Sequence, residues 1–202
     1  MWVSLLLLRF FTNLVCFCAN PWCRRSCKKT FLLTSTEARV SEKFREMLPL
    51  FVKSGRQCNA GDYRISFRFG RKNFYDCGRY WDERFGIRLL YKAETIACVA
   101  FKPCWRTIVI QQLQGSRGYE HMLASIRWER LLPLLVGIIF EKHWWWKSIA
   151  IIPASKCWYY GGDYENDKSL RALLRRRYDG TARALKFKFN PYSKLWVQSI
   201  KR

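Results

Sequence analysis

The sequence predicts an α/β fold in which a mixed β-sheet is flanked by helices and preceded by an apolar N-terminal extension. Three observations carry this prediction. A β-branched segment at residues 107–110 runs through a glycine-containing turn into a long helical pattern. A second short apolar strand follows at residues 147–152, and residues 187–200 have the pattern of a closing hairpin. This order of elements places helices against a sheet.

The length and composition indicate a folded protein. At 202 residues the chain is long enough for one substantial core, and we expect an extension at residues 1–34 and an α/β domain at residues 35–202. Apolar residues make up 50% of the chain and aromatic residues 17%, which is enough buried surface to offset the entropy of ordering. A disordered chain is therefore excluded.

The charge is strongly positive. The chain carries 37 lysines and arginines against 15 acidic residues, for a formal net charge of +22. Such a surface attracts phosphate-rich partners, and nucleic acid, an anionic membrane and a phosphorylated cofactor all fit. A basic protein without a specific partner has the same composition, so charge alone does not choose among them.

The first residues leave two interpretations open. Residues 2–19 are mostly apolar and resemble a signal peptide or a membrane helix, but the leucine run is short and Arg9 lies near the centre. A basic cluster at residues 24–29 would suit a membrane surface. We expect a packed N-terminal helix on a cytoplasmic protein, with membrane contact through residues 2–19 as the alternative.

The nine cysteines are an odd number and are scattered along the chain. Four of them, Cys16, Cys18, Cys23 and Cys27, lie close together. Their spacing matches neither a paired zinc knuckle nor a ferredoxin run, so we predict mostly reduced thiols and no metal site.

In the first half, helical spacing of apolar residues predicts a helix over residues 35–53. Alternation predicts a half-exposed strand at residues 63–69. A glycine- and charge-rich stretch up to Gly86 is predicted as loop and short helix. Strands at residues 87–91 and 95–101, joined by a turn, follow.

In the second half, one long helix is predicted over residues 119–142, with Pro133 kinking or dividing it. After the strand at residues 147–152, a polar loop leads to Ser169, a candidate N-cap for a basic helix over residues 170–185. The last hairpin is expected to turn at residues 190–193.

The turn from Gln112 to Gly118 is the strongest candidate site. A strand that ends in glycines and leads into a helix exposes backbone N–H groups at the positive end of the helix dipole. Gly115 and Gly118 would let a phosphate approach closely, and Arg117 adds a charged donor. The alternative is that the glycines only form a tight turn.

These residues resemble the second half of the GNAT acetyltransferase superfamily, over roughly the last hundred residues, and also resemble uncharacterised bacterial and viral proteins of GNAT-like layout. In that family a Q/R-x-x-G-x-G/A turn holds the pyrophosphate of acetyl-CoA. Gln112, Gly115 and Gly118 are the matching positions, but Ser116 and Arg117 stand where the family has one residue. The resemblance implies acetyl-CoA or another acyl-CoA as cofactor. It also implies that the strands around Ile110 and Ile151 separate beyond Gly115 to admit pantetheine.

The same resemblance points to a catalytic tyrosine. Family members often carry A-x-x-x-Y-x-K-x-G-F on the last main helix, where the tyrosine protonates the departing thiolate. Phe187 matches the terminal phenylalanine, Lys186 replaces the glycine and Ala182 stands in place of the tyrosine. Tyr178 lies one turn earlier and would take this role if the helix is shifted.

Glu129 is the candidate general base. Its place in a helix next to Trp128 would desolvate the carboxylate and raise its pKa. The alternative is an ordinary surface glutamate paired with Arg127 or Arg130.

Two function hypotheses follow. The first is an acyl-CoA-binding N-acyltransferase that moves an acyl group to an unknown amine acceptor. The second is a non-enzymatic protein that binds nucleic acid on the same fold. Aromatic clusters at residues 144–146 and 158–160 would then stack on bases, and the arginines between residues 171 and 183 would contact phosphates.

Overall fold

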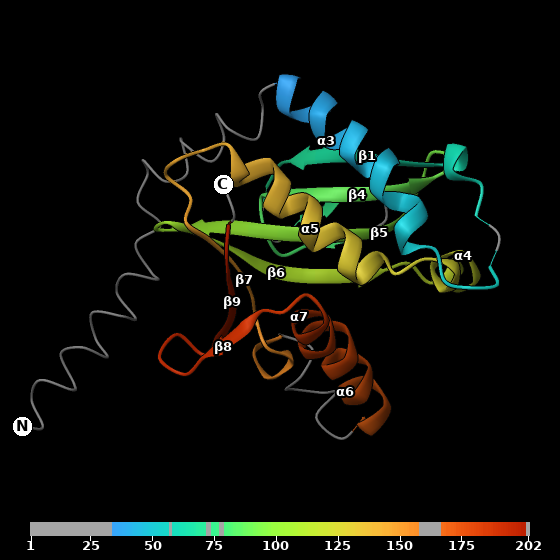
Figure 1. The fold of residues 1–202 in the computed structure, drawn as a ribbon. Coiled ribbons are helices and arrows are strands. Elements are labelled where there is room, and N and C mark those ends of the chain that lie inside the picture. Colours follow the sequence, from blue (N-terminus) through green and yellow to red (C-terminus); the bar gives the residue numbers. More distant parts are fainter. Residues whose placement is uncertain (1–33, 57, 72–73, 77–78, 158–166, 201–202) are drawn as a thin grey trace, which may run out of the picture.

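The computed structural model describes residues 34–200 apart from residues 57, 72–73, 77–78 and 158–166 (Figure 1). The expected N-terminal extension, its cysteine cluster, the aromatic cluster at residues 158–160 and most of the predicted polar loop lie outside the described residues.

A seven-stranded mixed sheet forms the centre of the fold, with strand order β1-β4-β5-β6-β7-β9-β8. Neighbouring strands are antiparallel except for β6 and β7, which are parallel. The fold class predicted from the sequence is confirmed. The strands are β1 (Tyr63–Phe69), β4 (Phe85–Tyr91), β5 (Glu94–Cys104), β6 (Thr107–Gly115), β7 (Ser148–Ile151), β8 (Lys188–Asn190) and β9 (Leu195–Ser199).

The prediction of loop and short helix before Gly86 is wrong. This stretch contains the antiparallel strands β2 (Phe74–Asp76) and β3 (Arg79–Trp81), which form a separate two-stranded sheet. Strands of three residues are too short for apolar alternation to be recognised among glycines and charges.

Helices α3 (Thr34–Met47) and α5 (Trp128–Glu141) run side by side along the sheet (Figure 1). A short 3₁₀ segment, η1 (Leu48–Phe51), continues α3. The helix predicted over residues 35–53 therefore ends at Phe51, and its last turn is 3₁₀. Arg39 joins the two helices, because its guanidinium donates to the Glu141 carboxylate and to the carbonyl of Ile138 at 2.7 Å.

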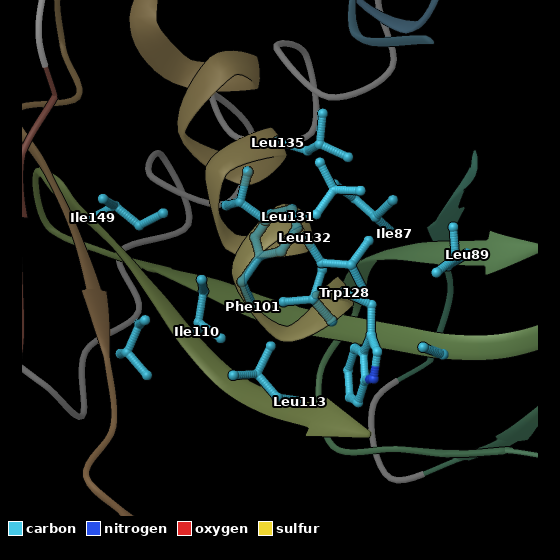
Figure 2. Close-up of a cluster of buried hydrophobic side chains, with 14 of the residues drawn as sticks. Ile87, Leu89, Phe101, Ile110, Leu113, Trp128, Leu131, Leu132, Leu135 and Ile149 are labelled. Atoms are coloured by element: carbon cyan, nitrogen blue, oxygen red, sulfur yellow. The ribbon is translucent and has the colours of Figure 1, made fainter. Parts of the chain in front are cut away.

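The core lies between α5 and the central strands. Figure 2 shows Leu131, Leu132 and Leu135 of α5 directed at buried side chains of the sheet. These include Ile87, Leu89, Phe101, Ile110, Leu113 and Ile149. The regular spacing of apolar residues along α5 therefore serves one continuous core, as helical periodicity predicts.

The single long helix predicted over residues 119–142 is wrong, because the chain forms α4 (Glu120–Ser125) and then α5. The break is held by the chain from Phe51 to Lys53, at the end of η1 and just after it. The amide of Arg127 donates to the carbonyl of Phe51 at 2.8 Å, and the amide of Lys53 donates to that of Ser125 at 2.9 Å. Pro133 lies inside α5 and does not divide it. Long-range pairing, rather than proline, interrupts the helix.

The predicted basic helix over residues 170–185 is present in three parts: α6 (Lys168–Arg175), the π-helical segment η6 (Arg176–Gly180) and α7 (Thr181–Ala184). Its N-cap is Asp167 rather than Ser169, since the Asp167 carboxylate accepts from the amides of Ser169 and Leu170 at 2.9 Å each. In the final hairpin the predicted turn is confirmed, and Asn190 Oδ1 accepts from the amides of Tyr192 and Ser193.

Candidate functional site

Gln112 lies inside strand β6 and not in a turn, so the predicted start of the glycine turn is wrong. Its side chain is buried, with Oε1 accepting from the backbone amide of Asp82 at 3.3 Å. Its Nε2 donates to Gln114 Oε1 at 2.7 Å. Gln112 therefore braces β6 against the bend that precedes β4.

Gly115 and Ser116 fasten the end of β6 to its surroundings. A Cβ on Gly115 would lie 2.9 Å from Leu123 Cδ1 and 3.2 Å from the Trp128 ring, so a side chain there would require these two side chains to move. The amide of Ser116 donates to the carbonyl of Ile96 at 2.7 Å, and its hydroxyl donates to that of Thr95 at 2.7 Å. Gly115 therefore packs against side chains of α4 and α5, and Ser116 is hydrogen-bonded to β5.

Arg117 and Gly118 form the exposed part of the turn. Gly118 has a φ of 83°, and an added Cβ would meet no atom within 4 Å, so its backbone borders open space. The helix that follows, α4, has only six residues. An anion at this turn would therefore be held by backbone amides and by Arg117, with a smaller helix dipole than the long helix predicted from the sequence.

The parallel pair β6–β7 stops before β6 does. Pairing runs from Thr107 with Ser148 to Ile110 with Ile151, whereas β6 continues to Gly115 against β5. A β-bulge at Gln111 interrupts the β5–β6 register at this point and bends the strand. The two strands thus separate at Ile110. The family resemblance had implied that they separate beyond Gly115. Among the described strands, none pairs with the other edge of β6 after Ile110.

Tyr178 occupies this edge of β6. Its hydroxyl accepts a hydrogen bond from the amide of Leu113 at 3.0 Å and lies 3.5 Å from the carbonyl of Gln111. The side chain is 2% exposed, and burial raises the pKa of its phenol well above the ordinary value. Tyr178 comes from the π-helical segment η6, a local widening that is frequent at functional sites. It is therefore a neutral donor and acceptor beside the strand.

Arg177 lies next to Tyr178 on the same edge. Its Nη1 is 3.5 Å from the carbonyl of Leu113, and its guanidinium carbon is 5.3 Å from the centre of the Trp128 ring. Burial lowers the pKa of Arg177, while the charge of Glu129 raises it. The two predicted catalytic residues, Glu129 and Tyr178, are thus brought to one region around Arg177, although they come from α5 and η6.

The sequence did not single out Arg177 or Asp82. Arg177 belongs to an arginine run that the pattern treats as one basic face, yet Arg175 and Arg176 are exposed and Arg177 is partly buried. The π-helical register of η6 turns it inward, and no sequence signal marks that register. Asp82 lies in the bend after β3, where burial raises the pKa of its carboxyl group. Its position beside Gln112 depends on strand pairing that the sequence pattern does not reveal.

The described residues contain no group of three or more histidine, cysteine or acidic side chains placed to hold a metal ion. In the same part of the chain, no helix is long and apolar enough to cross a membrane.

No protein family model matches the chain, and no curated protein sequence matches it. Among solved structures, the chain is similar to the GNAT family N-acetyltransferase YhbS from Escherichia coli in complex with CoA. The identity is 10%, the match covers 82% of this chain and 67% of that chain, and the TM-score is 0.33. At this level of similarity, the fold class rests on the strand order and register described above.

Proposed function

We propose that this protein is a GNAT-like N-acyltransferase that binds an acyl-CoA and moves its acyl group to an amine. One observation carries the proposal: β6 continues past its pairing with β7, and side chains from α5 and η6 converge on the strand edge that is left. Such an edge accepts an extended ligand that carries amide groups, because peptide N–H and C=O groups stand along it.

The phosphate end of the cofactor lies at the glycine turn in this proposal. Arg117 supplies a charged donor, and the exposed backbone at Gly118 supplies amides. Gly115, Ser116 and Gln112 act less directly, since their contacts with α4, β5 and the Asp82 bend hold the turn in place.

Residues 111–115 would hold the arm of the cofactor. The groups at Leu113 fit an amide-bearing arm, because its N–H is bonded to the Tyr178 hydroxyl and its carbonyl lies beside Arg177. Hydrogen-bonding groups of a ligand could take the places of the Tyr178 hydroxyl and the Arg177 guanidinium at Leu113. The buried Nε of Arg177 has no hydrogen-bond partner among the described residues, so it adds a donor at the same place.

When bound, the cofactor would supply an acyl group activated as a thioester. Tyr178 holds the proton that a departing thiolate needs, since burial keeps its phenol neutral. Glu129 is the base that we assign to the amine, and Arg177 would orient its carboxylate. The backbone amides of β6 would polarise the carbonyl under attack.

Titration calorimetry with acetyl-CoA tests this proposal. We expect one binding site, and we expect Arg117→Glu to weaken binding about tenfold or more, because a donor to phosphate becomes a like charge. Arg45→Glu is the matched control, since it makes the same charge change at an exposed position of α3 and should bind like the parent. Absence of heat with the parent, or equal losses in both variants, would contradict the proposal.

A further inference from the structure

Three tryptophans gather at the end of the sheet where β6 begins. Trp105 is 56% exposed and Trp144 is 69% exposed, although large aromatic side chains are usually well covered. Trp145 lies between them, with ring centres 5.9 Å from Trp105 and 5.6 Å from Trp144. We call this group the tryptophan surface.

Two loops form this surface, and they are fastened together. The β5–β6 turn carries Trp105, and the loop between α5 and β7 carries Trp144 and Trp145. Arg106 Nε donates to the carbonyl of Trp145 at 3.3 Å, and the amide of Lys147 donates to that of Arg106 at 2.8 Å. The two loops that carry the tryptophans are therefore joined to each other.

Trp105 is held in a costly backbone conformation. It occupies the tight turn between Cys104 and Thr107 with a φ of 51°, in the left-handed region that glycine and asparagine adopt readily. A bulky residue at such a position is strained, because its Cβ lies too close to the following carbonyl oxygen. An exposed aromatic that a turn tolerates at this cost suggests a role for the side chain rather than for the turn.

The surface is also basic. Lys142 and Lys147 are exposed at the two ends of the loop between α5 and β7. The guanidinium carbon of Arg106 lies 5.3 Å from the centre of the Trp145 ring. Neither residues 142–147 nor residues 104–107 include an acidic residue. Exposed tryptophans flanked by cations match the chemistry of a membrane–water interface.

We infer that the tryptophan surface docks on the headgroup region of an anionic lipid bilayer. Trp105 and Trp144 enter the interface, and Lys142, Lys147 and Arg106 attract acidic headgroups. The ring geometry favours lipid over nucleic acid. Trp105 and Trp144 meet Trp145 edge to face, at 62° and 90°, and Arg106 covers Trp145, so the three rings form no continuous platform of parallel faces for successive bases.

This surface is separate from the proposed acyl-CoA site. Strand β6 begins at the tryptophan surface and ends at the glycine turn, and its nine residues span about 30 Å. Docking on a bilayer would therefore leave the glycine turn and the β6 edge clear of the lipid.

Vesicle co-sedimentation of the full chain tests the inference. The probes are vesicles of phosphatidylcholine alone and of phosphatidylcholine mixed with phosphatidylglycerol. We expect the parent to bind the mixed vesicles preferentially, and the double variant Trp105→Asn, Trp144→Gln to lose about tenfold in partitioning. Asparagine suits the left-handed turn, so this variant should unfold at the same or a higher denaturant concentration than the parent.

Tyr192→Gln is the matched control, since it removes a 90% exposed aromatic from the β8–β9 turn. It should partition like the parent. The inference is overturned if the double variant binds mixed vesicles as well as the parent does, or if Tyr192→Gln loses as much. It is also overturned if the double variant loses only binding to a single-stranded oligonucleotide, which would assign the surface to nucleic acid.

Discussion

The hydroxyl of Tyr178 replaces a strand partner for Leu113. Where β7 ends, the amide of Leu113 would be buried without a hydrogen bond, and Tyr178 supplies one at 3.0 Å. The same hydroxyl is the proton donor of the proposed reaction. At the scale of single residues, the structural role and the proposed catalytic role therefore fall to one phenol, and variants must be designed to separate them.

Tyr178→Phe removes this hydroxyl without emptying the aromatic pocket. We expect the free energy of unfolding to fall by about 1–3 kcal/mol, because the Leu113 amide loses its acceptor. Urea denaturation measures the change. Tyr192→Phe, at an exposed turn, should leave the stability unchanged. Equal stability of Tyr178→Phe and the parent would mean that the Leu113 bond contributes nothing.

Asp82 gives a pH-dependent prediction. Burial raises its pKa in the folded protein above the ordinary value of 3.8, so its contribution to stability is complete in acid and is lost as pH rises through the folded-state pKa. At neutral pH the buried charge is unfavourable. Asp82→Asn should therefore raise the free energy of unfolding at pH 7, and the gain should disappear toward pH 4.

Urea denaturation across this pH range measures the effect of Asp82→Asn. The matched control is Glu120→Gln, which removes one negative charge from an exposed position of α4. A stabilisation by both variants, or one that grows in acid, would show that burial of Asp82 is not the cause.

At the scale of elements, the sequence predicts those whose pattern is local. Strand β1 matches its predicted bounds, and the β4–β5 turn falls at Lys92 and Ala93, both with positive φ. The final hairpin turn is stabilised by Asn190, as its residue type indicates. Apolar spacing and turn residues carry enough information for these elements.

Elements set by distant contacts were not predictable. The break between α4 and α5 depends on hydrogen bonds to the chain around Phe51 and Lys53. The π-helical segment η6 carries Arg177 and Tyr178 inward, and nothing in its residue types marks the change of register. The candidate site lies where these unpredictable features meet. The sequence therefore predicted residues of the site but not how they are arranged.

Two glycines test how elements pack. A Cβ at Gly86 would lie 2.2 Å from the Trp81 ring and 2.8 Å from the carbonyl of Val99, between β4 and β5. We expect Gly86→Ala to reduce the free energy of unfolding by about 1–3 kcal/mol. In contrast, a Cβ at Gly137 would meet no atom within 4 Å inside α5. Gly137→Ala should stabilise by about 0.5–1 kcal/mol.

Thermal or urea denaturation of both glycine variants distinguishes packing from propensity. Similar effects of the two substitutions would contradict the close approach of Trp81 to the sheet at Gly86.

At the scale of the whole molecule, one sheet carries two surfaces of different chemistry at opposite ends of β6. The glycine turn and the β6 edge form the proposed acyl-CoA site, and the tryptophan surface faces an anionic bilayer. A net charge of +22 favours both, because CoA phosphates and lipid headgroups are anionic. High salt should therefore weaken both interactions, and only substitutions at one end or the other will separate them.

The proposed acyl-CoA site depends most on the edge of β6, and NMR of the Leu113 amide tests it directly. Protein labelled with ¹⁵N-leucine is titrated with acetyl-CoA, and Leu113→Ile assigns the resonance. We predict a saturable shift of the Leu113 resonance, because its N–H exchanges the Tyr178 hydroxyl for the ligand, while Leu89 in β4 stays unchanged. Two results would contradict acyl-CoA binding at the β6 edge: a Leu113 resonance that stays in place while other leucine resonances shift, or no shift of any leucine resonance.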